Sequence, residues 1–498
     1  MIEEEAASTA PSIIPFSQND RFVGQDLQLA KLEAKLFNDR QTTTFAVLGP
    51  GGTGKSPLAL ELAYRTRQKN KNCSVFWVDA SDIDSLYQSY ASIAQKLDIP
   101  GWDDEKTDVK QLVKLHLEGK GARQCLLIFD NTEDISLGSS GLSAVQAADL
   151  MDYLPQSELC SVVFTTTKGN TAKRLASQNI VELWELMPET AQSMLGNYSR
   201  ALVSRSEQQE AKLLLQELSY ISLAIVQAAA YINNSEDGRK GDALEHNDVL
   251  TEDKPRGYNE QNPITTTMFI SIEMIQEKDP LAVDCLYLAA CVDSKDIPLD
   301  VLQASLPNER EDAIKVLSRY ELVTRRPAES AFDLHRLVHL ALREWLQKQL
   351  QLGQWTQHAI TQLLRVFPDH DHGNRSKWRR LLPHAKYALS YGSAEGEGDD
   401  RLTLVCRCAM TLYSDGRYNE AEELFVQVME TRKRVLGKEH PFTLTSMANL
   451  ASMYRNQGRW KGAEELEVQV METSSRVLGK EHPSTLTSMA HLAFTLKS

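Results

Sequence analysis

The sequence lacks the patterns that mark disulfide-linked, zinc-binding and membrane-spanning proteins. Its seven cysteines are scattered and odd in number, and no C-x-x-C pair occurs, so neither a disulfide framework nor a zinc site is indicated. The chain has no run of about 18 apolar residues. Its N-terminus, "MIEEEAASTAPSIIPF", is acidic and lacks the basic stretch and apolar core of a secretion signal. We therefore expect a cytoplasmic protein without a membrane partner.

Positive charge is also scarce. The formal net charge is −14 at pH 7, which leaves no overall electrostatic footprint for nucleic acid, so we expect no nucleic-acid partner. The basic cluster "RSKWRR" at residues 375–380 has a size that is typical of a solvated helix face. The pattern "PDHDHG" contains His370 and His372 without a third group of metal ligands, so we expect a loop there and not a metal site.

Short apolar runs alternate with helical stretches in the first part of the chain. The runs are bounded by turn residues and cover residues 43–49, 73–80, 124–131 and 160–167. Continuous apolar strands separated by helices are what a parallel sheet with helices on both faces requires. We therefore expect an α/β domain in this part of the chain.

The loop "GPGGTGKS" at residues 49–56 carries the clearest chemistry. It matches G-x-x-x-x-G-K-[ST] and lies between an apolar strand and the helical stretch "LALELAYR". Glycines let the backbone wrap phosphates and point N–H groups inward, with the dipole of the following helix behind them. Lys55 is expected to reach the β- and γ-phosphates and Ser56 to bind Mg²⁺. The rest of the expected cradle consists of Gly49, Gly51, Gly52, Thr53 and Gly54. The alternative is a glycine-rich turn without a ligand.

Pro57 follows this loop directly. Proline suits the first turn of a helix, because the N–H groups of that turn have no partner within the helix. It also removes a donor that could meet the α-phosphate, at a cost of about 1.5–3 kcal/mol if that hydrogen bond is lost. We expect weaker nucleotide binding, not its absence.

A second strand supplies the expected metal-binding carboxylate. The apolar run in "CLLIFDNTED" ends at Asp130, where a P-loop protein places the acid that holds Mg²⁺, usually through water. Asn131 stands where a hydrolytic enzyme often has a second acid. Glu133 and Asp134 could take that catalytic role or be loop charges. The sequence supports nucleotide binding better than turnover.

The C-terminal part contains an internal repeat. Two similar blocks begin at Asp415 and Gln457, and the glycines of their "GKEHP" strings, Gly437 and Gly479, stand 42 residues apart. Each block offers two amphipathic helices separated by glycine and proline, which predicts a helical solenoid with two full units and a partial third.

Changes in pattern place the domain boundaries. Residues 263–350 combine helices with one hairpin, "ELVTRRPAESAFDLH", which suggests a winged-helix module. We expect a tail at 1–20, a nucleotide-binding domain at 21–185, a helical subdomain at 186–233, a polar linker at 234–262, a winged-helix-like domain at 263–350, a helical connector at 351–398 and the repeats at 399–498.

Taken in order, the motif strings resemble fungal NLR-like STAND ATPases of the NB-ARC class with C-terminal kinesin-light-chain-type tetratricopeptide repeats. The resemblance runs from about Arg21 to the end of the chain, through "RFVGQ", "GPGGTGKSPLALELAYR", "LLIFDN", "VVFTTT", "SLAIVQAAAYI", "FDLHRLVHLALREWL" and both "LGKEHPxTLTSMAxLA" blocks. It implies a switch in which ADP holds the modules closed and exchange for ATP opens them for homo-oligomerisation. The repeats would sense signals and bind protein partners. An effector domain would precede such a switch, and this chain has about 20 residues there.

The resemblance also implies roles for single residues. Val23 and Gly24 would line the adenine pocket. His335, which spacing alone presents as a structural histidine, would contact the β-phosphate of ADP. Several positions depart from the family pattern: Gln25 replaces an arginine, Thr167 stands at a sensor arginine with Lys168 as a stand-in, Ser222 replaces a proline near the adenine, and Arg336 replaces an aspartate. Each change weakens a nucleotide or interdomain contact.

Three functions remain open at this point. The sequence favours a nucleotide-binding signalling switch with little ATP turnover. A scaffold with a vestigial P-loop, in which the repeats alone bind partners, is the second interpretation. A slow ATPase is the third, and it ranks lower because no residue is clearly placed to activate water.

Overall fold

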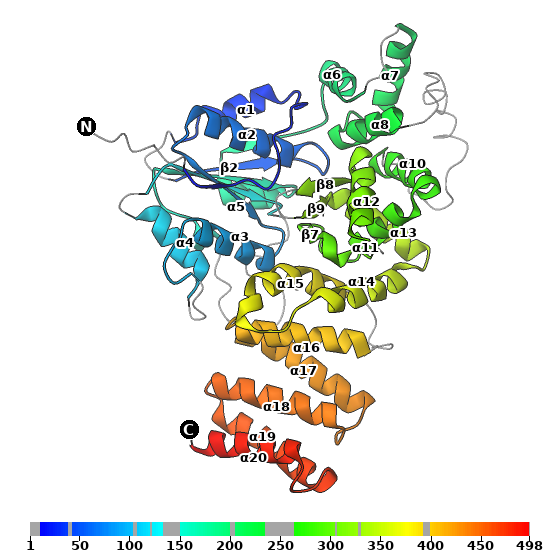
Figure 1. The fold of residues 1–498 in the computed structure, drawn as a ribbon. Coiled ribbons are helices and arrows are strands. Elements are labelled where there is room, and N and C mark those ends of the chain that lie inside the picture. The colour runs from blue at the N-terminus through cyan, green and yellow to red at the C-terminus, as the bar shows by residue number, and fades with distance from the viewer. Residues whose placement is uncertain are drawn as a thin grey trace, which may run out of the picture. The chain divides into compact units, whose positions relative to one another are not determined.

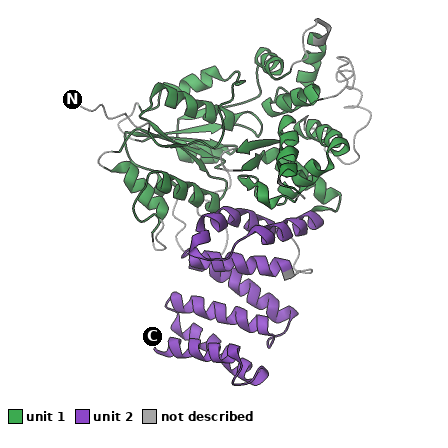
Figure 2. Ribbon diagram, in the orientation of Figure 1, with its two compact units in different colours: residues 1–352 green, residues 353–498 purple. Residues whose placement is uncertain are grey.

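The structure is a computed structural model that describes residues 10–37, 42–102, 107–119, 122–132, 150–199, 205–234, 263–303, 306–326, 330–391 and 399–497. These residues belong to two units that are divided after Leu352, drawn in green and purple in Figure 2. Within the described residues, no helix is long and apolar enough to cross a lipid bilayer.

A six-stranded sheet forms the centre of the N-terminal part of the first unit (Figure 1), and its strands pair in the order β1-β3-β4-β5-β2-β6. All five pairings are parallel. The strands are β1 (Ser12–Ile13), β2 (Thr43–Leu48), β3 (Ser74–Asp79), β4 (Cys125–Asp130), β5 (Cys160–Thr166) and β6 (Ile180–Glu182). The four apolar runs in the sequence are therefore confirmed as β2 to β5. Every residue of β4 and β5 is buried, as expected for central strands covered on both faces.

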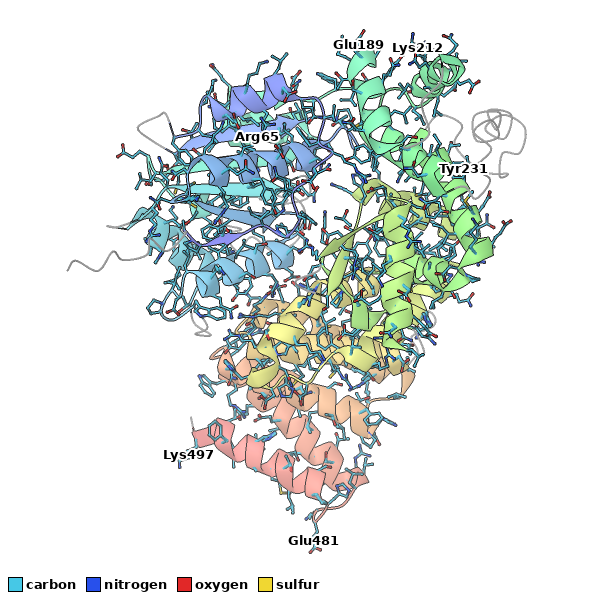
Figure 3. The ribbon with its side chains drawn as sticks, turned by 45° about the horizontal axis from the view of Figure 1, so that its top comes forward. Arg65, Glu189, Lys212, Tyr231, Glu481 and Lys497 are labelled. Carbon is cyan, nitrogen blue, oxygen red and sulfur yellow. The ribbon has the colours of Figure 1, made fainter. Side chains whose placement is uncertain are left out.

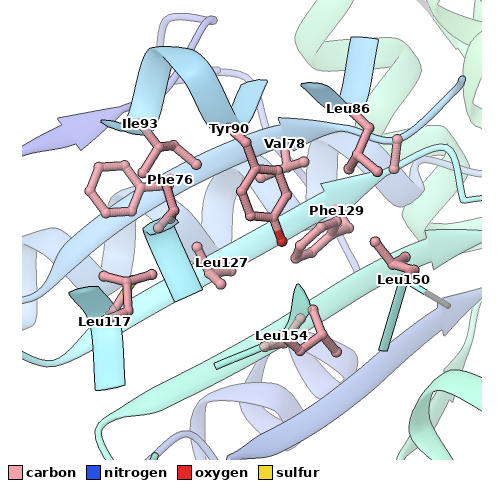
Figure 4. Packing of buried hydrophobic residues seen from close by; sticks show 14 of the residues in the cluster. Phe76, Val78, Leu86, Tyr90, Ile93, Leu117, Leu127, Phe129, Leu150 and Leu154 are labelled. Atoms are coloured by element: carbon pink, nitrogen blue, oxygen red, sulfur yellow. The ribbon is translucent and has the colours of Figure 1, made fainter. Parts of the chain in front are cut away.

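Helices cover both faces of this sheet. They are α1 (Asp26–Glu33), α2 (Lys55–Lys69), α3 (Ile83–Lys96), α4 (Val109–Glu118), the short η1 (Leu150–Tyr153) and α5 (Gly169–Ala176). On one face, Tyr90 of α3 packs against Phe129 of β4 with ring centroids 6.3 Å apart (Figure 4). On the other face, Leu58 and Leu62 of α2 join Val47 and Ile128 in a second cluster. The carboxyl ends of the strands are thereby held at one fixed edge.

Two further modules complete the first unit. The helical module contains α6 (Pro188–Tyr198), α7 (Arg205–Glu217) and α8 (Ser222–Asn234), on which Figure 3 labels Glu189, Lys212 and Tyr231. The winged-helix module contains α10 (Pro263–Lys278), α11 (Pro280–Ala289), β7 (Ile297–Pro298), η2 (Leu299–Val301), α12 (Pro307–Arg319), β8 (Val323–Arg326), β9 (Ala331–Leu334) and α13 (Arg336–Lys348). β8 and β9 pair antiparallel, which confirms the expected hairpin. Most of the polar linker, residues 235–262, lies outside the described residues. The domain boundaries themselves stay predictions.

The second unit is helical. It contains α14 (Leu352–Val366), η4 (His372–Asn374), α15 (Arg375–Ser390), α16 (Asp399–Ser414), α17 (Tyr418–Val435), α18 (Pro441–Asn456), α19 (Trp460–Val477) and α20 (Pro483–Lys497). The helices α17 and α18 return as α19 and α20 with the offset of 42 residues that the sequence shows. Gly437 and Gly479 end equivalent helices with φ of 94° and 98°, where a side chain would be strained. The repeat is thus confirmed as pairs of helices.

The basic cluster at residues 375–380 corrects the sequence interpretation. Arg375 and Arg379 are 7% and 3% exposed, so this part of α15 is not a solvated face. Both guanidinium groups donate to Asp415 Oδ1, from Arg375 Nη2 at 2.9 Å and from Arg379 Nε at 3.0 Å. A buried carboxylate thus holds both arginines inside the second unit, which the charge run alone could not indicate.

Candidate functional site

The phosphate-binding loop lies between β2 and α2, as the motif predicts. Gly52 and Gly54 have φ of 81° and 91°, a left-handed conformation in which glycine carries no steric penalty. A Cβ atom on Gly49 would clash with the carbonyl oxygen of Leu183 and come within 3.0 Å of Thr53 Oγ1. The loop therefore requires glycine at these positions for its shape, before any ligand is considered.

Lys55 begins α2 and its ammonium group folds back over the loop. Its Nζ donates to the carbonyl oxygens of Gly49 at 2.9 Å and Pro50 at 2.8 Å. Burial lowers the pKa of Lys55 to about 8, Asp130 opposes this shift, and Arg336 adds to it. Lys55 therefore keeps most of its positive charge at pH 7, at the place where the motif puts the β- and γ-phosphates.

Ser56 and Asp130 meet across the sheet edge. Asp130 ends β4 and is 2% exposed. Ser56 Oγ donates to Asp130 Oδ1 at 2.7 Å. A carboxylate beside a hydroxyl, next to a phosphate loop, is a set of hard oxygen donors that fits Mg²⁺ held partly through water. The structure thus joins the two residues that the sequence assigned to the metal.

Thr165 also holds Asp130, a role that no sequence motif indicated. Its Oγ1 donates to Asp130 Oδ1 at 2.5 Å and accepts the N–H of Asn131 at 3.0 Å. Asn131 has φ of 64°, a left-handed conformation that asparagine tolerates better than most residues. The threonine run at the end of β5 was the available signal, because parallel neighbours end at the same sheet edge. Glu133 and Asp134, the two possible catalytic acids, lie outside the described residues.

Residues from the helical and winged-helix modules touch the loop glycines. The N–H of Leu223 in α8 donates to the carbonyl of Gly52 at 3.1 Å. A Cβ built on Gly51 would lie 2.9 Å from the methyl groups of Leu337, and one on Gly52 would lie 3.0 Å from Ile264 Cδ1. Three modules therefore converge on the phosphate loop. Ile264 and Leu337 are apolar residues without a motif, so sequence gave no signal for them.

His335 precedes α13 and caps its first turn. Its Nδ1 accepts the N–H of Leu337 at 3.2 Å, so the neutral ring carries its proton on Nε2. The ring still reaches solvent, but the surrounding protein, Lys295 and Lys55 lower its pKa to about 3. His335 is therefore neutral at physiological pH and lies within electrostatic range of Lys55.

The residues that the family resemblance places near the adenine lie close to Thr53. Gln25 Nε2 donates to the carbonyl of Thr53 at 2.9 Å, and Ser222 Oγ lies 3.5 Å from the same oxygen. Among the described residues, none donates to the buried Gln25 Oε1. Val23 and Gly24 lead into α1, and Gly24 has φ of 77° with Thr190 packed against it. Gln25 and Ser222 thus fasten the loop backbone from two modules.

The remaining expected residues, Thr167, Lys168 and Pro57, are exposed. Thr167 and Lys168 are exposed positions between β5 and α5, and no hydrogen bond joins Thr167 to the loop in the described part of the chain. Pro57 is exposed in the first turn of α2, one residue after Ser56.

Two family models match this chain. Residues 25–202 match the NB-ARC domain, and residues 400–474 match the tetratricopeptide repeat. These matches cover strands β2 to β6 with the phosphate-binding loop, and most of the repeat region. They agree with the architecture described above.

A curated relative and a solved structure each match most of this chain. A nucleotide-binding leucine-rich repeat (NLR)-like protein of Hyaloscypha variabilis is 33% identical over 458 residues, which are 87% of this chain and 46% of that protein. The chain thus spans about half the length of this relative. The crystal structure of a STAND protein with a tetratricopeptide repeat sensor from Pyrococcus horikoshii matches 97% of this chain and 72% of its own, with a TM-score of 0.52 and 16% identity. At this identity the likeness shows a shared fold.

Proposed function

We propose that this chain, an NLR-like STAND protein in which an NB-ARC module precedes tetratricopeptide repeats, is a signal-transduction switch controlled by bound ADP or ATP. The observation that carries the proposal is the 2.7 Å hydrogen bond between Ser56 Oγ and Asp130 Oδ1 beside the Lys55 ammonium. This contact supports the proposal because the two residues that we assign to Mg²⁺ touch each other, and the cation that we assign to the phosphates lies within electrostatic range of Asp130, despite several departures from the family pattern around them.

The site residues divide the work of holding a nucleotide. The loop N–H groups and Lys55 bind the phosphates, and Ser56 and Asp130 hold Mg²⁺, which would neutralise phosphate charge. His335 donates a hydrogen bond from its Nε2–H group to the β-phosphate of ADP. Since its ring is neutral, it reads the phosphate by a hydrogen bond and not by charge.

We infer slow ATP hydrolysis from Asn131, the residue that follows the metal-binding Asp130. Asn131 has a side-chain amide, which cannot accept a proton from water at neutral pH. Its backbone N–H is held by Thr165 at 3.0 Å. We therefore assign the site to nucleotide binding and exchange, with hydrolysis slow or absent.

Contacts between modules connect the nucleotide to the state of the protein. Leu223 and Leu337 touch Gly52 and Gly51, so a change in loop shape must alter the packing of α8 and α13. We propose that ADP keeps this packing and that ATP releases it, which permits homo-oligomerisation. The repeats then act as the sensor that binds protein partners, and the protein acts in the cytoplasm. Fungal innate immunity is the proposed setting.

Calorimetric titration of the full chain with ADP and with ATP, each with and without Mg²⁺, tests the switch. We expect wild type to bind, and Lys55→Ala to lose at least about tenfold in affinity because a charge-assisted phosphate contact is removed. Lys69→Ala is the matched control, since Lys69 ends the same helix and pairs with Glu33 at 2.6 Å.

Two outcomes would overturn parts of the proposal. Wild type that binds neither nucleotide at millimolar concentration would refute the switch and leave the repeat scaffold with a vestigial loop. Steady phosphate release from ATP, abolished by Asp130→Ala, would refute low turnover and identify a working ATPase.

A further inference from the structure

The segment at residues 10–21, drawn in the darkest blue in Figure 1, is built into the first unit instead of forming the tail that the sequence suggested. Its strand β1 pairs with the edge of β3, with Ser12 opposite Val75 and Ile13 opposite Phe76. The N–H of Ala10 donates to the carbonyl of Lys71 at 3.2 Å. A composition rich in serine and proline gave no sign of this pairing. We call residues 10–21 the clasp.

The clasp also follows α2, the helix that begins with Lys55. Tyr64 Oη donates to the carbonyl of Phe16 at 2.6 Å. Gln18 Nε2 donates to Glu61 Oε2 at 3.3 Å. Both partners belong to α2, so the clasp is joined to the helix that carries the phosphate-binding residues.

Phe16 faces the winged-helix module with its ring. One side packs edge-on against Trp77 of β3 with centroids 6.0 Å apart. The guanidinium of Arg326 and the ammonium of Lys295 lie 5.1 Å and 5.9 Å from the ring centroid. Asp333 binds the same two cations, Arg326 Nε at 2.6 Å and Lys295 Nζ at 3.4 Å. The ring thus joins the sheet to a charged cluster on the β8–β9 side of the winged-helix module.

The end of the clasp reaches the helical module. Asn19 Nδ2 donates to Tyr198 Oη at 2.9 Å, and Arg21 lies 5.6 Å above the Tyr198 ring. Burial raises the pKa of Glu321, which follows α12, and the Arg21 charge opposes this shift. Within twelve residues, the chain therefore contacts all three modules of the first unit.

We propose that residues 10–21 are a releasable clasp that holds the winged-helix and helical modules against the nucleotide module. The contacts to those modules are few and involve mostly half-buried side chains, and cation–π and single hydrogen-bond contacts are each worth about 1–2 kcal/mol. β1 adds only two paired residues at a sheet edge. A clasp of this kind belongs to the low-stability parts of a fold, which open before the core does. Displacement of the clasp therefore loosens both modules, with or without nucleotide, and leaves their contacts with the phosphate loop as the remaining hold.

Hydrogen exchange on the full chain without nucleotide tests the clasp, so the outcome does not depend on the proposed switch. In Phe16→Ala, we expect exchange of the backbone N–H groups in β8 and β9 to accelerate about tenfold, because the aromatic contact to both cations is lost. The central strands β4 and β5 should keep their protection. Gln18→Ala is the matched control, since Gln18 contacts α2 and no other module in the described part of the chain.

A second variant covers the case in which Phe16→Ala unfolds the sheet. Tyr198→Phe keeps the ring under Arg21 and removes only the oxygen that accepts from Asn19. We expect faster exchange at the end of α6, with β3 unchanged. The proposal is overturned if Phe16→Ala and Gln18→Ala give the same exchange in β8 and β9, or if Tyr198→Phe leaves α6 as protected as in wild type.

Discussion

The repeat region and the proposed nucleotide site differ in how far the sequence determines the environment of a residue. In the repeats, nearly identical residues meet different surroundings. Leu444 in α18 is 5% exposed, whereas its equivalent in α20, Leu486, is 54% exposed. In the proposed nucleotide site, several residues depart from the family pattern, yet Ser56 still donates to Asp130 and Lys55 still folds back over the loop.

The difference shows which neighbouring elements determine the environment of a residue in the repeats and the geometry of the site. A solenoid helix is covered by the next unit, so the surroundings of a residue depend on what packs beside it as well as on its own repeat. The site depends on the loop backbone and two strand ends, which the sheet fixes. Substitutions at its rim leave that frame in place.

The largest effect that we expect is a loss of stability from a substitution at the start of the repeats. Asp415 is buried between Arg375 and Arg379, whereas the equivalent residue in the next unit is Gln457. Asp415→Ala leaves two buried guanidinium groups without this carboxylate, so we expect unfolding of the second unit to become easier by about 3–5 kcal/mol. Urea unfolding followed by circular dichroism measures the change.

Gln457→Ala is the control for this variant. Gln457 makes a 3.2 Å hydrogen bond to Glu422 at a half-buried position, so we expect a loss below about 1.5 kcal/mol. Equal losses at the two positions would show that the buried arginines contribute nothing specific, and would refute this part of the comparison.

The next effect uses the pair of equivalent leucines. Leu444→Ala opens a cavity in the packed face of α18, which should lower the free energy of unfolding by about 2–5 kcal/mol. Leu486→Ala removes a side chain that is already exposed, so we expect a change within about 0.5 kcal/mol. Thermal unfolding of both variants provides the test. A large loss in Leu486→Ala would mean that this face of α20 is covered in solution.

A buried histidine extends the comparison to pH. His335 and His339 lie four residues apart, but His339 is 3% exposed and its Nε2 donates to the carbonyl of Val292 at 2.9 Å. Burial lowers the pKa of His339 to about 4, helped by Arg343 and Arg336 and opposed by the hydrogen bond. Since the folded state favours the neutral ring, its stability contribution is complete above pH 6.5 and is lost as the pH falls towards 4.

Urea unfolding at pH 7 and pH 5 measures this contribution. We expect wild type to lose about 2 kcal/mol through His339 over that interval. His339→Gln keeps a hydrogen-bond donor and cannot titrate, so its loss should be smaller by that amount. The same loss in both proteins would show that His339 is protonated inside the fold at pH 5.

Local pattern explains what the sequence could predict. The sheet, the phosphate loop and Asp130 each rest on a run of a few residues, and the repeat rests on direct identity between two blocks. The missed residues act across long separations: Thr165 lies 35 residues from Asp130, and Phe16 contacts Arg326. A side chain such as Leu337 has no local signature, because its role appears only when the winged-helix module packs on Gly51.

The smallest effect concerns the proline after the loop. Pro57 is the third residue of α2, and the N–H that follows it, from Leu58, already bonds to the carbonyl of Gly54 at 3.0 Å. Pro57→Thr restores a free N–H beside Ser56, so we expect ADP to bind up to about tenfold more tightly in calorimetric titration. Pro57→Ala restores the same N–H without a hydroxyl group. If both variants tighten binding, the backbone donor is responsible; if only the threonine does, the hydroxyl is. Unchanged affinity in both variants would mean that Pro57 serves only to begin the helix. Pro57 would then not be one of the residues that weaken nucleotide binding.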